Sequence, residues 1–353
     1  MRKGKRLIAW IMAVVMLFTI CVFGGNGTAE AAATTPVAKH GRLSVKGADL
    51  VDSKGNKFQL RGISTHGINW DVGSPYVNKK AFKTLRDDWG VNAIRLAMYT
   101  EEYNGYCSGG SQAKLRKQVD KGVRYATDLG MYAIIDWHIL SDGNPNKNKS
   151  QAKKFFTTMA KKYKNNKNVI YEICNEPNGC GWKEIKSYAT DIIKTIRKYD
   201  KKAVIIVGTP TWSQLGTDGT SNEVADSPIK GYKNIMYSLH FYASEWAHNE
   251  YLPAKVAYAR KKKLPIIVSE FGLSPASGDG AINKASADKW MKLLNKYNIS
   301  YFCWSLSNKN ESASLLKPST KKTSGWKSGD LSTAGKYIKK KYLARKKALG
   351  KKA

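Results

Sequence analysis

The sequence predicts an α/β protein folded as one (β/α)8 TIM barrel, and three observations support this prediction. Short apolar runs alternate with amphipathic stretches along the chain, a pattern typical of a parallel sheet covered by helices. About 320 residues follow an apolar leader, a length that suits eight repeats of strand and helix. Polar and aromatic side chains gather at the ends of the apolar runs, which in a barrel meet at the face that carries active sites.

The chain opens with a basic segment at 1–6, an apolar run from Leu7 to Phe23 and small residues around Ala29-Glu30-Ala31. This order is that of a secretory signal peptide, which we expect to span residues 1–31 and to be removed. A membrane anchor is the alternative, because the apolar run nearly reaches the length that spans a bilayer. We therefore expect a secreted, extracellular protein that begins with a short segment at 32–40.

A small β-hairpin is predicted ahead of the barrel. Residues 41–47 and 50–56 have the pattern of such a hairpin, with a turn at Lys54-Gly55-Asn56, and it would close the bottom of the barrel. Eight apolar runs then predict the barrel strands. They cover residues 59–63, 93–97, 132–136, 169–173, 203–207, 235–239, 265–268 and 301–304.

Amphipathic stretches between these runs predict the surrounding helices. They cover residues 79–89, 114–129, 151–163, 182–199, 253–263 and 285–298. No linker rich in Pro, Ser or Thr divides the chain, so we expect one barrel domain over residues 41–343. The residues beyond it, 344–353, are expected to form a basic tail in which a last barrel helix frays.

The chain is very basic, with a formal net charge of +33 at pH 7. Such a charge favours weak contact with polyanions such as acidic cell-wall polymers, lipid head groups or nucleic acid. The simpler interpretation, which we prefer, is a solvated lysine-rich surface that keeps the protein soluble. The sequence contains no motif typical of nucleic-acid modules, so no specific nucleic-acid partner is expected. We expect the protein to be a monomer.

Four cysteines follow the leader. Cys107 and Cys180 lie in loop-like sequence, and a disulfide between them is an open alternative in a secreted protein. Cys174 and Cys303 lie in apolar runs and are expected to be buried thiols. No pair of Cys or His residues has the spacing of zinc ligands, so we expect no metal and no other cofactor.

Two glutamates follow apolar runs, Glu176 after the fourth and Glu270 after the seventh. Taken singly, each is more simply explained as a loop residue that caps a nearby helix. However, other polar and aromatic residues occupy the same position after other runs, and their coincidence on one face favours a catalytic cleft. These residues are His66, Trp70, Arg95, Tyr99, His138, Asn175, His240, Tyr242 and Trp304.

At these residues the chain resembles glycoside hydrolase family 5, the cellulase family, over about residues 41–342. The first motif is Ile173-Cys174-Asn175-Glu176-Pro177, and its tripeptide Asn175-Glu176-Pro177 is weak evidence alone. The other motifs, in order along the chain and at barrel spacing, make the resemblance specific. They are Ser238-Leu239-His240-Phe241-Tyr242, Val268-Ser269-Glu270-Phe271-Gly272 and Trp304-Ser305-Leu306-Ser307-Asn308-Lys309, and the stretch 306–311 is similar to the bacterial endoglucanase branch.

The resemblance implies a double displacement that retains the configuration of the anomeric carbon. Glu176 would act as the acid and then the base, and Glu270 as the nucleophile, with their carboxyl groups roughly 5 Å apart. Burial and the nearby charge of Glu270 would keep Glu176 protonated near neutral pH. Arg95 and Tyr242 are expected to stabilise the negative charge of Glu270.

The resemblance also implies a set of sugar contacts. Asn175 would bind the 2-hydroxyl group of the sugar, and Trp304 would lie under the ring at the cleavage point. The histidines of the cleft would contact sugar or support the glutamates, and both roles remain open. Trp212 would stack on the leaving-group side, with loop packing as an equal alternative. The remaining expected contacts are His66, Trp70, Tyr99, His138, His240, Lys309 and Glu311.

We therefore expect a secreted endo-β-1,4-glucanase that cuts internal bonds of cellulose or mixed-linkage β-glucan. A mannanase or xylanase with the same chemistry is the nearest alternative, because these glycans differ from glucan at one substituent of the ring. A non-catalytic glycan-binding or wall-binding protein is a second alternative. A third is a polyanion-binding protein built on a barrel that has lost its activity.

Overall fold

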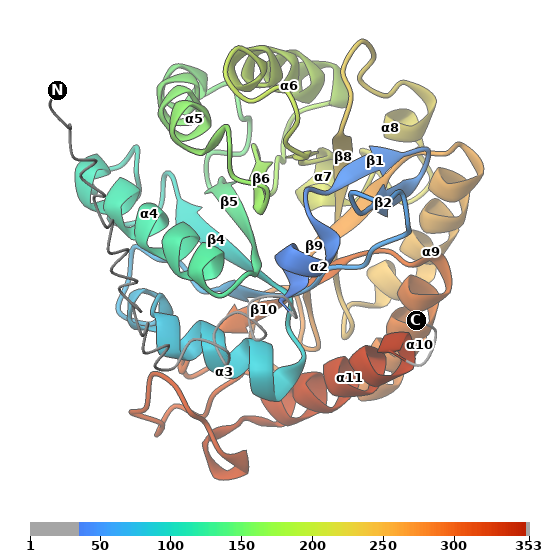
Figure 1. The fold of residues 1–353 in the computed structure, drawn as a ribbon. Coiled ribbons are helices and arrows are strands. Elements are labelled where there is room, and N and C mark those ends of the chain that lie inside the picture. Colours follow the sequence, from blue (N-terminus) through green and yellow to red (C-terminus); the bar gives the residue numbers. More distant parts are fainter. Residues whose placement is uncertain (1–34, 351–353) are drawn as a thin grey trace, which may run out of the picture.

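The structure is a computed structural model, and it describes residues 35–350. The expected signal peptide at 1–31 lies outside these residues. Within them, eight parallel strands close a barrel in the order β10-β3-β4-β5-β6-β7-β8-β9, so the predicted TIM barrel is confirmed (Figure 1). The strands are β3 (Arg61–Thr65), β4 (Ala93–Tyr99), β5 (Tyr132–His138), β6 (Val169–Glu172), β7 (Ile205–Val207), β8 (Ile235–Tyr242), β9 (Ile266–Gly272) and β10 (Tyr301–Leu306).

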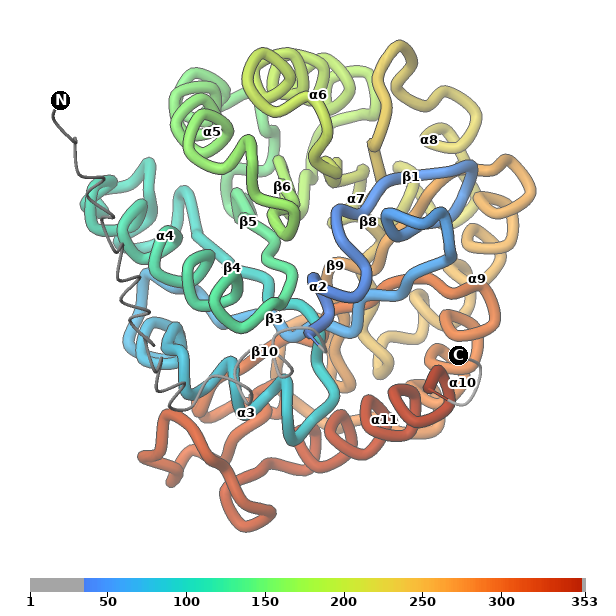
Figure 2. The backbone as a smooth tube through the Cα atoms, viewed as in Figure 1, coloured from blue at the N-terminus to red at the C-terminus, as the bar shows by residue number. Residues whose placement is uncertain are grey.

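Helices follow the strands and surround the barrel, as the backbone trace in Figure 2 shows. Each long helix buries an apolar face against the strands, such as Ile185, Ile192 and Ile196 of α6. The described helices are α2 (Pro36–His40), α3 (Lys79–Trp89), α4 (Gln112–Asp128), α5 (Lys149–Tyr163), α6 (Trp182–Arg197), α7 (Pro210–Ser213), α8 (Glu223–Asp226), α9 (Trp246–Lys261), α10 (Lys284–Tyr297) and α11 (Thr333–Gly350), with short 3₁₀ turns at Ser74–Tyr76 and Ser328–Asp330.

The predicted start of one helix was wrong. The amphipathic pattern predicted a helix over 253–263, but α9 already begins at Trp246 and contains Pro253. The side chain of Asn249 stabilises this earlier first turn by donating to the carbonyl oxygens of Ala243 and Glu245, both at 2.9 Å. These contacts are tertiary and do not appear in the sequence pattern.

An N-terminal hairpin, β1 (Ser44–Lys46) and β2 (Asp49–Val51), lies against the barrel opening that faces the viewer in Figure 1. Lys46 pairs with Asp49, so the turn lies between them and not at Lys54-Gly55-Asn56 as predicted. The predicted residues form a second turn after β2, which the Asp52 carboxylate stabilises by accepting from the N–H groups of Lys54 and Asn56. The hairpin buries Leu43 and Leu50 among inward-facing side chains of the strands, and it therefore closes the bottom of the barrel.

Several strands continue further than their apolar runs predicted. β8 extends to Tyr242 and β9 to Gly272, so His240 and Glu270 lie inside strands and not after them. The same holds for His138 in β5, whereas Trp304 lies inside β10 as predicted. Polar residues can continue a strand here because their main chains still pair with the neighbouring strand while their side chains enter the barrel.

Helix α11 continues through Gly350, well into the tail that was predicted to begin at residue 344. The helix buries Ile338 and Tyr342, and two of its polar contacts reach the residues around β3. The hydroxyl group of Tyr342 donates to the carbonyl oxygen of Gly62 at 2.8 Å, and Arg345 donates to the side chain of Gln59 at 2.8 Å. The first residues of the predicted tail are therefore part of an ordered helix.

The four cysteines of the described residues are free thiols. Cys174 and Cys303 are fully buried, as predicted. Cys107 and Cys180 pack on the edge of the hydrophobic core without forming a disulfide, so that alternative is not realised. Burial raises the pKa of Cys107 to about 12 and that of Cys180 to about 11, which keeps both thiols protonated and unreactive at neutral pH.

Candidate active site

A cavity of about 590 Å³ opens at the C-terminal ends of the strands, the face opposite the hairpin. Most of the predicted site residues line it, whereas Arg95 and Asn175 are fully buried beneath it. The predicted residues in its wall are His66, Trp70, Tyr99, His138, Glu176, Trp212, His240, Tyr242, Glu270, Trp304, Lys309 and Glu311. Sequence reasoning missed other wall residues, among them Glu102, Leu140, Gln214, Glu245, His248 and Ser277.

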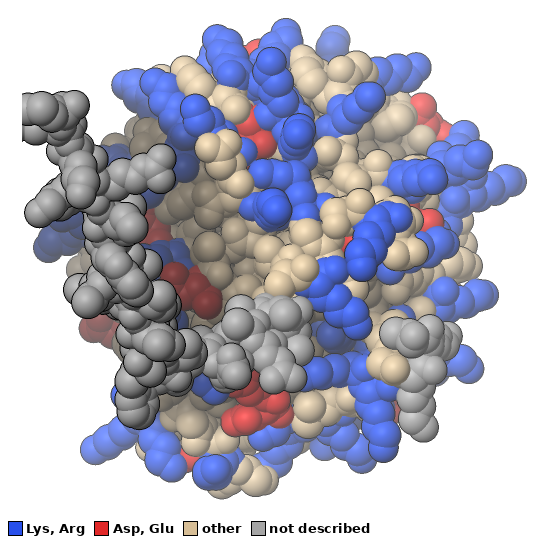
Figure 3. All heavy atoms as spheres, in the orientation of Figure 1, with Lys and Arg blue, Asp and Glu red and all other residues tan. Residues whose placement is uncertain are grey.

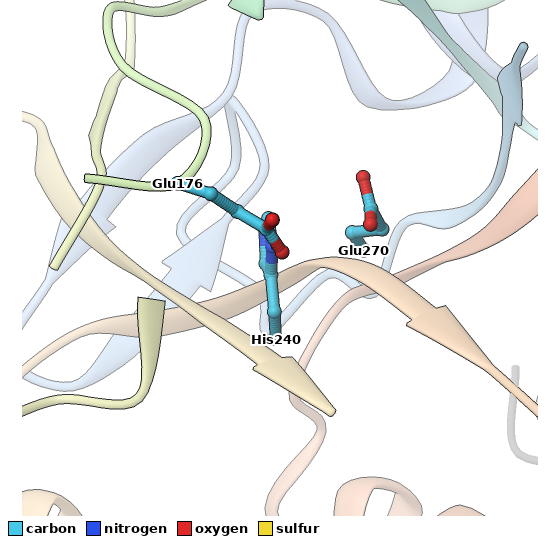
Figure 4. Close-up of side chains that lie close together, drawn as sticks. All are labelled: Glu176, His240 and Glu270. Atoms are coloured by element: carbon cyan, nitrogen blue, oxygen red, sulfur yellow. The ribbon is translucent and has the colours of Figure 1, made fainter. Parts of the chain in front are cut away.

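The two glutamates meet across this cavity (Figure 4). Glu176 follows β6 and Glu270 lies in β9, and Figure 4 shows the Glu176 carboxyl group at the ring of His240 with Glu270 on the other side. One oxygen of each carboxyl group and one nitrogen of His240 all lie within 4.8 Å of one another. This cluster is compact enough to hold a cation. The same short distance between the two carboxyl groups also allows both of them to act on one sugar carbon.

Glu270 is held by two donors. Arg95 Nη1 donates to Oε2 at 2.9 Å, and the Tyr242 hydroxyl group donates to Oε1 at 2.8 Å. The Glu270 side chain is only 6% exposed. Burial alone would lower the pKa of Arg95, but the adjacent carboxylates raise it well above its ordinary value. Arg95 therefore remains a fixed positive charge under Glu270, and both oxygens of the Glu270 carboxyl group are held by charged or hydroxyl donors.

Arg95 is also the centre of a buried charged network. Its guanidinium group contacts Glu172 at 2.7 Å and Asp136 at 3.1 Å, and it donates to the side chain of Asn175 at 2.5 Å. Sequence reasoning missed Asp136 and Glu172. The sequence did contain a signal for them, because each is an acidic residue inside an apolar run. Each also lies two residues from an inward-facing apolar residue, as Asp136 does from Ile134, so its side chain must face the barrel interior as well.

Glu176 is paired with His240, whose Nδ1 lies 2.7 Å from Glu176 Oε1. Burial raises the pKa of Glu176 to about 8, and the charges of Asp136 and Glu172 add to this rise while Arg95 opposes it. Burial also lowers the pKa of His240 to about 4. Between these values the histidine is neutral and the glutamic acid is protonated, so Glu176 can donate a proton near neutral pH.

His240 is fixed on its other side as well. Its Nε2 lies 2.9 Å from the hydroxyl group of Ser269, which in turn lies 2.5 Å from the hydroxyl group of Ser238. A neutral imidazole that donates from Nε2 has Nδ1 free to accept from Glu176. The serine pair therefore sets the orientation of the histidine that holds the acid.

Asn175 and His138 form the next part of the floor. His138 Nδ1 lies 2.6 Å from Asp136 Oδ2, and Asn175 donates to the carbonyl oxygen of Ile139 at 3.0 Å. Burial lowers the pKa of His138 to about 3, so this ring is neutral. Because Asn175 is fully buried and bonded to protein on both sides of its amide, the expected contact with a sugar hydroxyl group stays a prediction.

An aromatic floor lies beside the glutamates. The ring of Trp304 is nearly parallel to that of His138, with centroids 5.3 Å apart, and its centroid lies 5.1 Å from that of His66. Trp70 packs against Tyr99 at 4.5 Å. Flat aromatic surfaces of this kind suit the apolar face of a pyranose ring.

One end of the cleft carries an unsatisfied carboxylate. Glu311 is nearly buried, and Lys309 pairs with its Oε2 at 2.5 Å. Its Oε1 is buried without a hydrogen-bond partner among the described residues, and His66 Nε2 lies 3.7 Å from it. A buried acceptor without a partner is costly, so this oxygen is ready to accept from a ligand hydroxyl group.

The opposite end carries Trp212, which is 44% exposed. Three consecutive residues, Thr211 to Ser213, have positive φ angles of 56°, 52° and 62°. Such a conformation costs about 1–2 kcal/mol for each residue that is not glycine. Two hydrogen bonds maintain it, from Trp212 N–H to the carbonyl oxygen of Pro177 at 3.1 Å and from the Ser213 hydroxyl group to that of Asn175 at 2.7 Å. The strained loop is thus tied to the segment that carries Glu176.

A closed parallel barrel with two carboxyl groups facing each other over an aromatic floor is an arrangement suited to glycoside hydrolysis. Residues 51–310 match the family described as cellulase, glycosyl hydrolase family 5. The chain therefore belongs to glycosyl hydrolase family 5, the cellulase family.

Relatives of known activity and structure agree with this membership. The chain is 47% identical over 339 residues to an endoglucanase of Clostridium saccharobutylicum, covering 95% of this chain and 72% of the relative. It is 44% identical to endoglucanase 5 of Pectobacterium carotovorum, covering 92% of this chain but only 62% of the relative. The catalytic domain of Thermobifida fusca endoglucanase Cel5A superposes with a TM-score of 0.82 at 36% identity, over 88% of this chain and 99% of that domain.

Proposed function

We propose that this family 5 enzyme is an endo-β-1,4-glucanase that cleaves with retention of configuration. The observation that carries the proposal is the separation of at most 4.8 Å between an oxygen of Glu176 and one of Glu270. At this distance a carboxylate attacks the sugar directly, whereas inverting enzymes need a wider gap for a water molecule. The different surroundings of the two groups, Arg95 and Tyr242 at Glu270 and His240 at Glu176, support distinct roles for them.

In the first step, a carboxylate oxygen of Glu270 attacks the anomeric carbon. The glycosidic bond breaks, and the leaving oxygen takes the proton of Glu176, so a glycosyl ester forms on Glu270. Arg95 and Tyr242 hold the attacking carboxylate in place by donating to it. The raised pKa of Glu176 keeps its proton available for the leaving group.

In the second step, ionised Glu176 removes a proton from water, and the water oxygen attacks the same carbon. The ester bond breaks and Glu270 regains its charge. Two inversions at one carbon give net retention. His240 lies 2.7 Å from Glu176 Oε1 and holds that carboxyl group in place, and its lowered pKa of about 4 keeps the ring neutral near pH 7.

The substrate is proposed to be a neutral β-1,4-glucan, either cellulose or mixed-linkage glucan. The aromatic floor and the free Glu311 oxygen suit sugar rings with equatorial hydroxyl groups. A variant of the T. fusca catalytic domain has been solved in complex with cellotetraose, and it is 36% identical to this chain with a TM-score of 0.81. Mannan and xylan are the alternatives that an assay must separate.

Secretion is part of the proposal. It rests on the basic and apolar leader at 1–31, which lies outside the described residues. Among residues 35–350, none of the helices is both long and apolar enough to cross a bilayer. Recovery of a chain beginning near residue 32 from the culture medium would support secretion, and retention of the intact leader on membranes would contradict it.

Weak contact with polyanions is proposed for the surface away from the cleft. Lys and Arg side chains spread across the bottom face of the barrel in Figure 3, and the chain carries 60 such residues against 27 Asp and Glu. Binding to an anionic wall polymer should weaken steeply as salt rises, while hydrolysis of soluble neutral glucan should not. Binding that survives high salt would contradict an electrostatic contact.

The stereochemical outcome tests the mechanism. Proton NMR of early hydrolysis products should show the β-anomer first, and initial formation of the α-anomer would overturn the proposal. Reducing-end release should be compared on carboxymethylcellulose, barley glucan, mannan and xylan. A non-catalytic glycan-binding protein would release nothing from any of them.

The variant Glu176→Gln tests the acid. It should lose activity on cellulose, whose leaving group needs a proton, and keep most of its first step on an activated aryl cellobioside, whose leaving group does not. Equal losses on both substrates would remove Glu176 from the acid role.

A further inference from the structure

Large aromatic side chains are exposed near both ends of the cleft. On helix α9, Trp246 is 68% exposed and Tyr251 is 38% exposed, and their rings meet edge to face with centroids 5.8 Å apart. Neither ring lines the cavity that holds the glutamates. Exposed apolar groups in a cluster mark binding surfaces more often than single exposed residues do.

The aromatic pair stands directly beside the cleft wall. Trp246 lies between Glu245 and His248, and both of these line the cavity. Tyr242 donates its hydroxyl group to Glu270 and its main-chain N–H to His248 Nδ1, the latter at 2.9 Å. The first turn of α9 is therefore joined to the strand that builds the catalytic centre.

The pair also belongs to the Trp212 end of the cleft. Lys255 of the same helix donates to the carbonyl oxygen of Gln214 at 3.1 Å, and Gln214 lines the cavity two residues beyond Trp212. The ring of Tyr251 packs so closely on Gly219 that a Cβ atom there would lie 2.9 Å from it. The loop that presents Trp212 thus continues under the aromatic pair.

The support of Trp246 is rigid. Asn249 donates from its amide to the carbonyl oxygens of Ala243 and Glu245 and accepts from the indole N–H of Trp290 at 2.9 Å. The Glu245 carboxylate accepts from the N–H of Ala276 at 2.7 Å. The main chain that carries Trp246 is therefore fixed, and the ring itself contacts Tyr251.

We propose that Trp246 and Tyr251 form an additional sugar-binding subsite for a β-glucan chain that leaves the cleft past Trp212. This inference rests on the proposed glucanase function and extends it to longer substrates. The pair would stack on a glucosyl unit distal to the cleavage point on the leaving-group side. The occupant is the same polysaccharide that fills the cleft, because the pair continues the cleft wall.

Chain length separates this role from a structural one. The variants Trp246→Ala and Tyr251→Ala should reduce kcat/KM on cellohexaose by roughly three- to tenfold, the value of one aromatic contact. They should leave kcat/KM on p-nitrophenyl cellobioside within about twofold, because that substrate is too short to reach the pair. On cellopentaose labelled at its reducing end, cleavage should shift toward that end.

The matched control is Tyr103→Ala. Tyr103 is 81% exposed and its carbonyl oxygen accepts from Trp70, so it lies at the opposite end of the cleft and should not reproduce the shift. Equal activity of wild type and Trp246→Ala on every chain length would refute the proposed subsite. The exposed pair would then be better explained as a contact surface for another protein. An equal loss on the short aryl substrate would also overturn it. Failure of the wild type on all β-glucans would instead refute the proposed function.

Discussion

The two halves of the barrel interior are built from the same strands but contain opposite kinds of side chain. In β5, Tyr132 and Ile134 face an apolar cluster at the bottom, where the hairpin closes the barrel. Further along the same strand, Asp136 and His138 face the charged network at the top. Because alternate residues of a strand share a face, one strand supplies both halves without any change in its backbone.

The halves also differ in what they contribute to folding. The lower half buries apolar side chains, each contributing about 1.5–3 kcal/mol when fully buried. The upper half buries three carboxylates around Arg95, and Asp136 Oδ1 and Glu172 Oε1 have no hydrogen-bond partner among the described residues. Desolvation of such groups is costly. The apolar lower half therefore stabilises the fold, and this stability offsets the cost of burying the charged groups of the upper half.

The largest expected effect comes from replacing Glu270 of the upper half, the proposed nucleophile. Glu270→Gln should reduce kcat on carboxymethylcellulose by roughly 10⁴-fold or more, as for other removed catalytic nucleophiles, with little change in the melting temperature. Reducing-sugar assays and thermal unfolding measure the two quantities. The control Glu250→Gln, on the exposed surface of α9, should keep full activity. A Glu270→Gln variant with a tenth of wild-type activity would contradict the assigned role.

The next effect falls on stability. Arg95→Met should lower the free energy of unfolding by about 3–5 kcal/mol, because it leaves buried carboxylates without their cation. Urea denaturation measures this loss. Arg124→Met, at an exposed position on α4, should change the same quantity by about 0.5 kcal/mol or less. Similar losses of unfolding free energy in both variants would mean that the buried charge network around Arg95 does not contribute to stability as proposed.

The third effect is a pH dependence. The pKa of Glu176 is raised from 4.5 to about 8, so kcat/KM should fall tenfold per pH unit above about pH 8, where the acid has lost its proton. Glu172→Gln removes a charge that raises this pKa and should move the alkaline limb to lower pH. Because folded Glu176 holds its proton more tightly than the unfolded chain does, its contribution to stability declines as pH rises from about 4.5 to 8. An alkaline limb that stays in place in the variant would contradict this coupling.

The smallest expected effect comes from a substitution in the apolar lower half. Ile134→Val removes one methylene group from the apolar cluster and should cost about 0.5–1.5 kcal/mol of unfolding free energy. The kcat on soluble glucan should not change, because the side chain lies below the charged network. A clear loss of kcat at full folding would show that the two halves are mechanically coupled.

Sequence reasoning found the barrel because the two hydrophobic periods are local signals. It found Glu176 and Glu270 because both stand at the ends of apolar runs, in motifs that resemble a known family. It placed the ends of β8 and β9 too early, since polar residues such as His240 interrupt an apolar run while the main chain keeps its pairing. It misplaced the hairpin turn because two turns follow each other closely, and only pairing across the strands distinguishes them.

The buried acids show a different limit. Asp136 and Glu172 raise the pKa of Glu176, whereas the sequence argument assigned that influence to Glu270. Their importance depends on a shared contact with Arg95 across three strands, which no local pattern contains. The same holds for the tie between Ser213 and the main chain of Asn175. Long-range polar contacts are therefore what the sequence left undetermined.

The left-handed run from Thr211 to Ser213 has a consequence for how this enzyme can be altered. Glycine adopts that conformation at no steric penalty, so Thr211→Gly would relax the backbone there. The relaxed loop would then have many orientations open to it, and the indole of Trp212 would spend less time facing an incoming polymer. Substitutions intended to raise the thermostability of this protein should therefore avoid residues 211–213, because they set the orientation of Trp212.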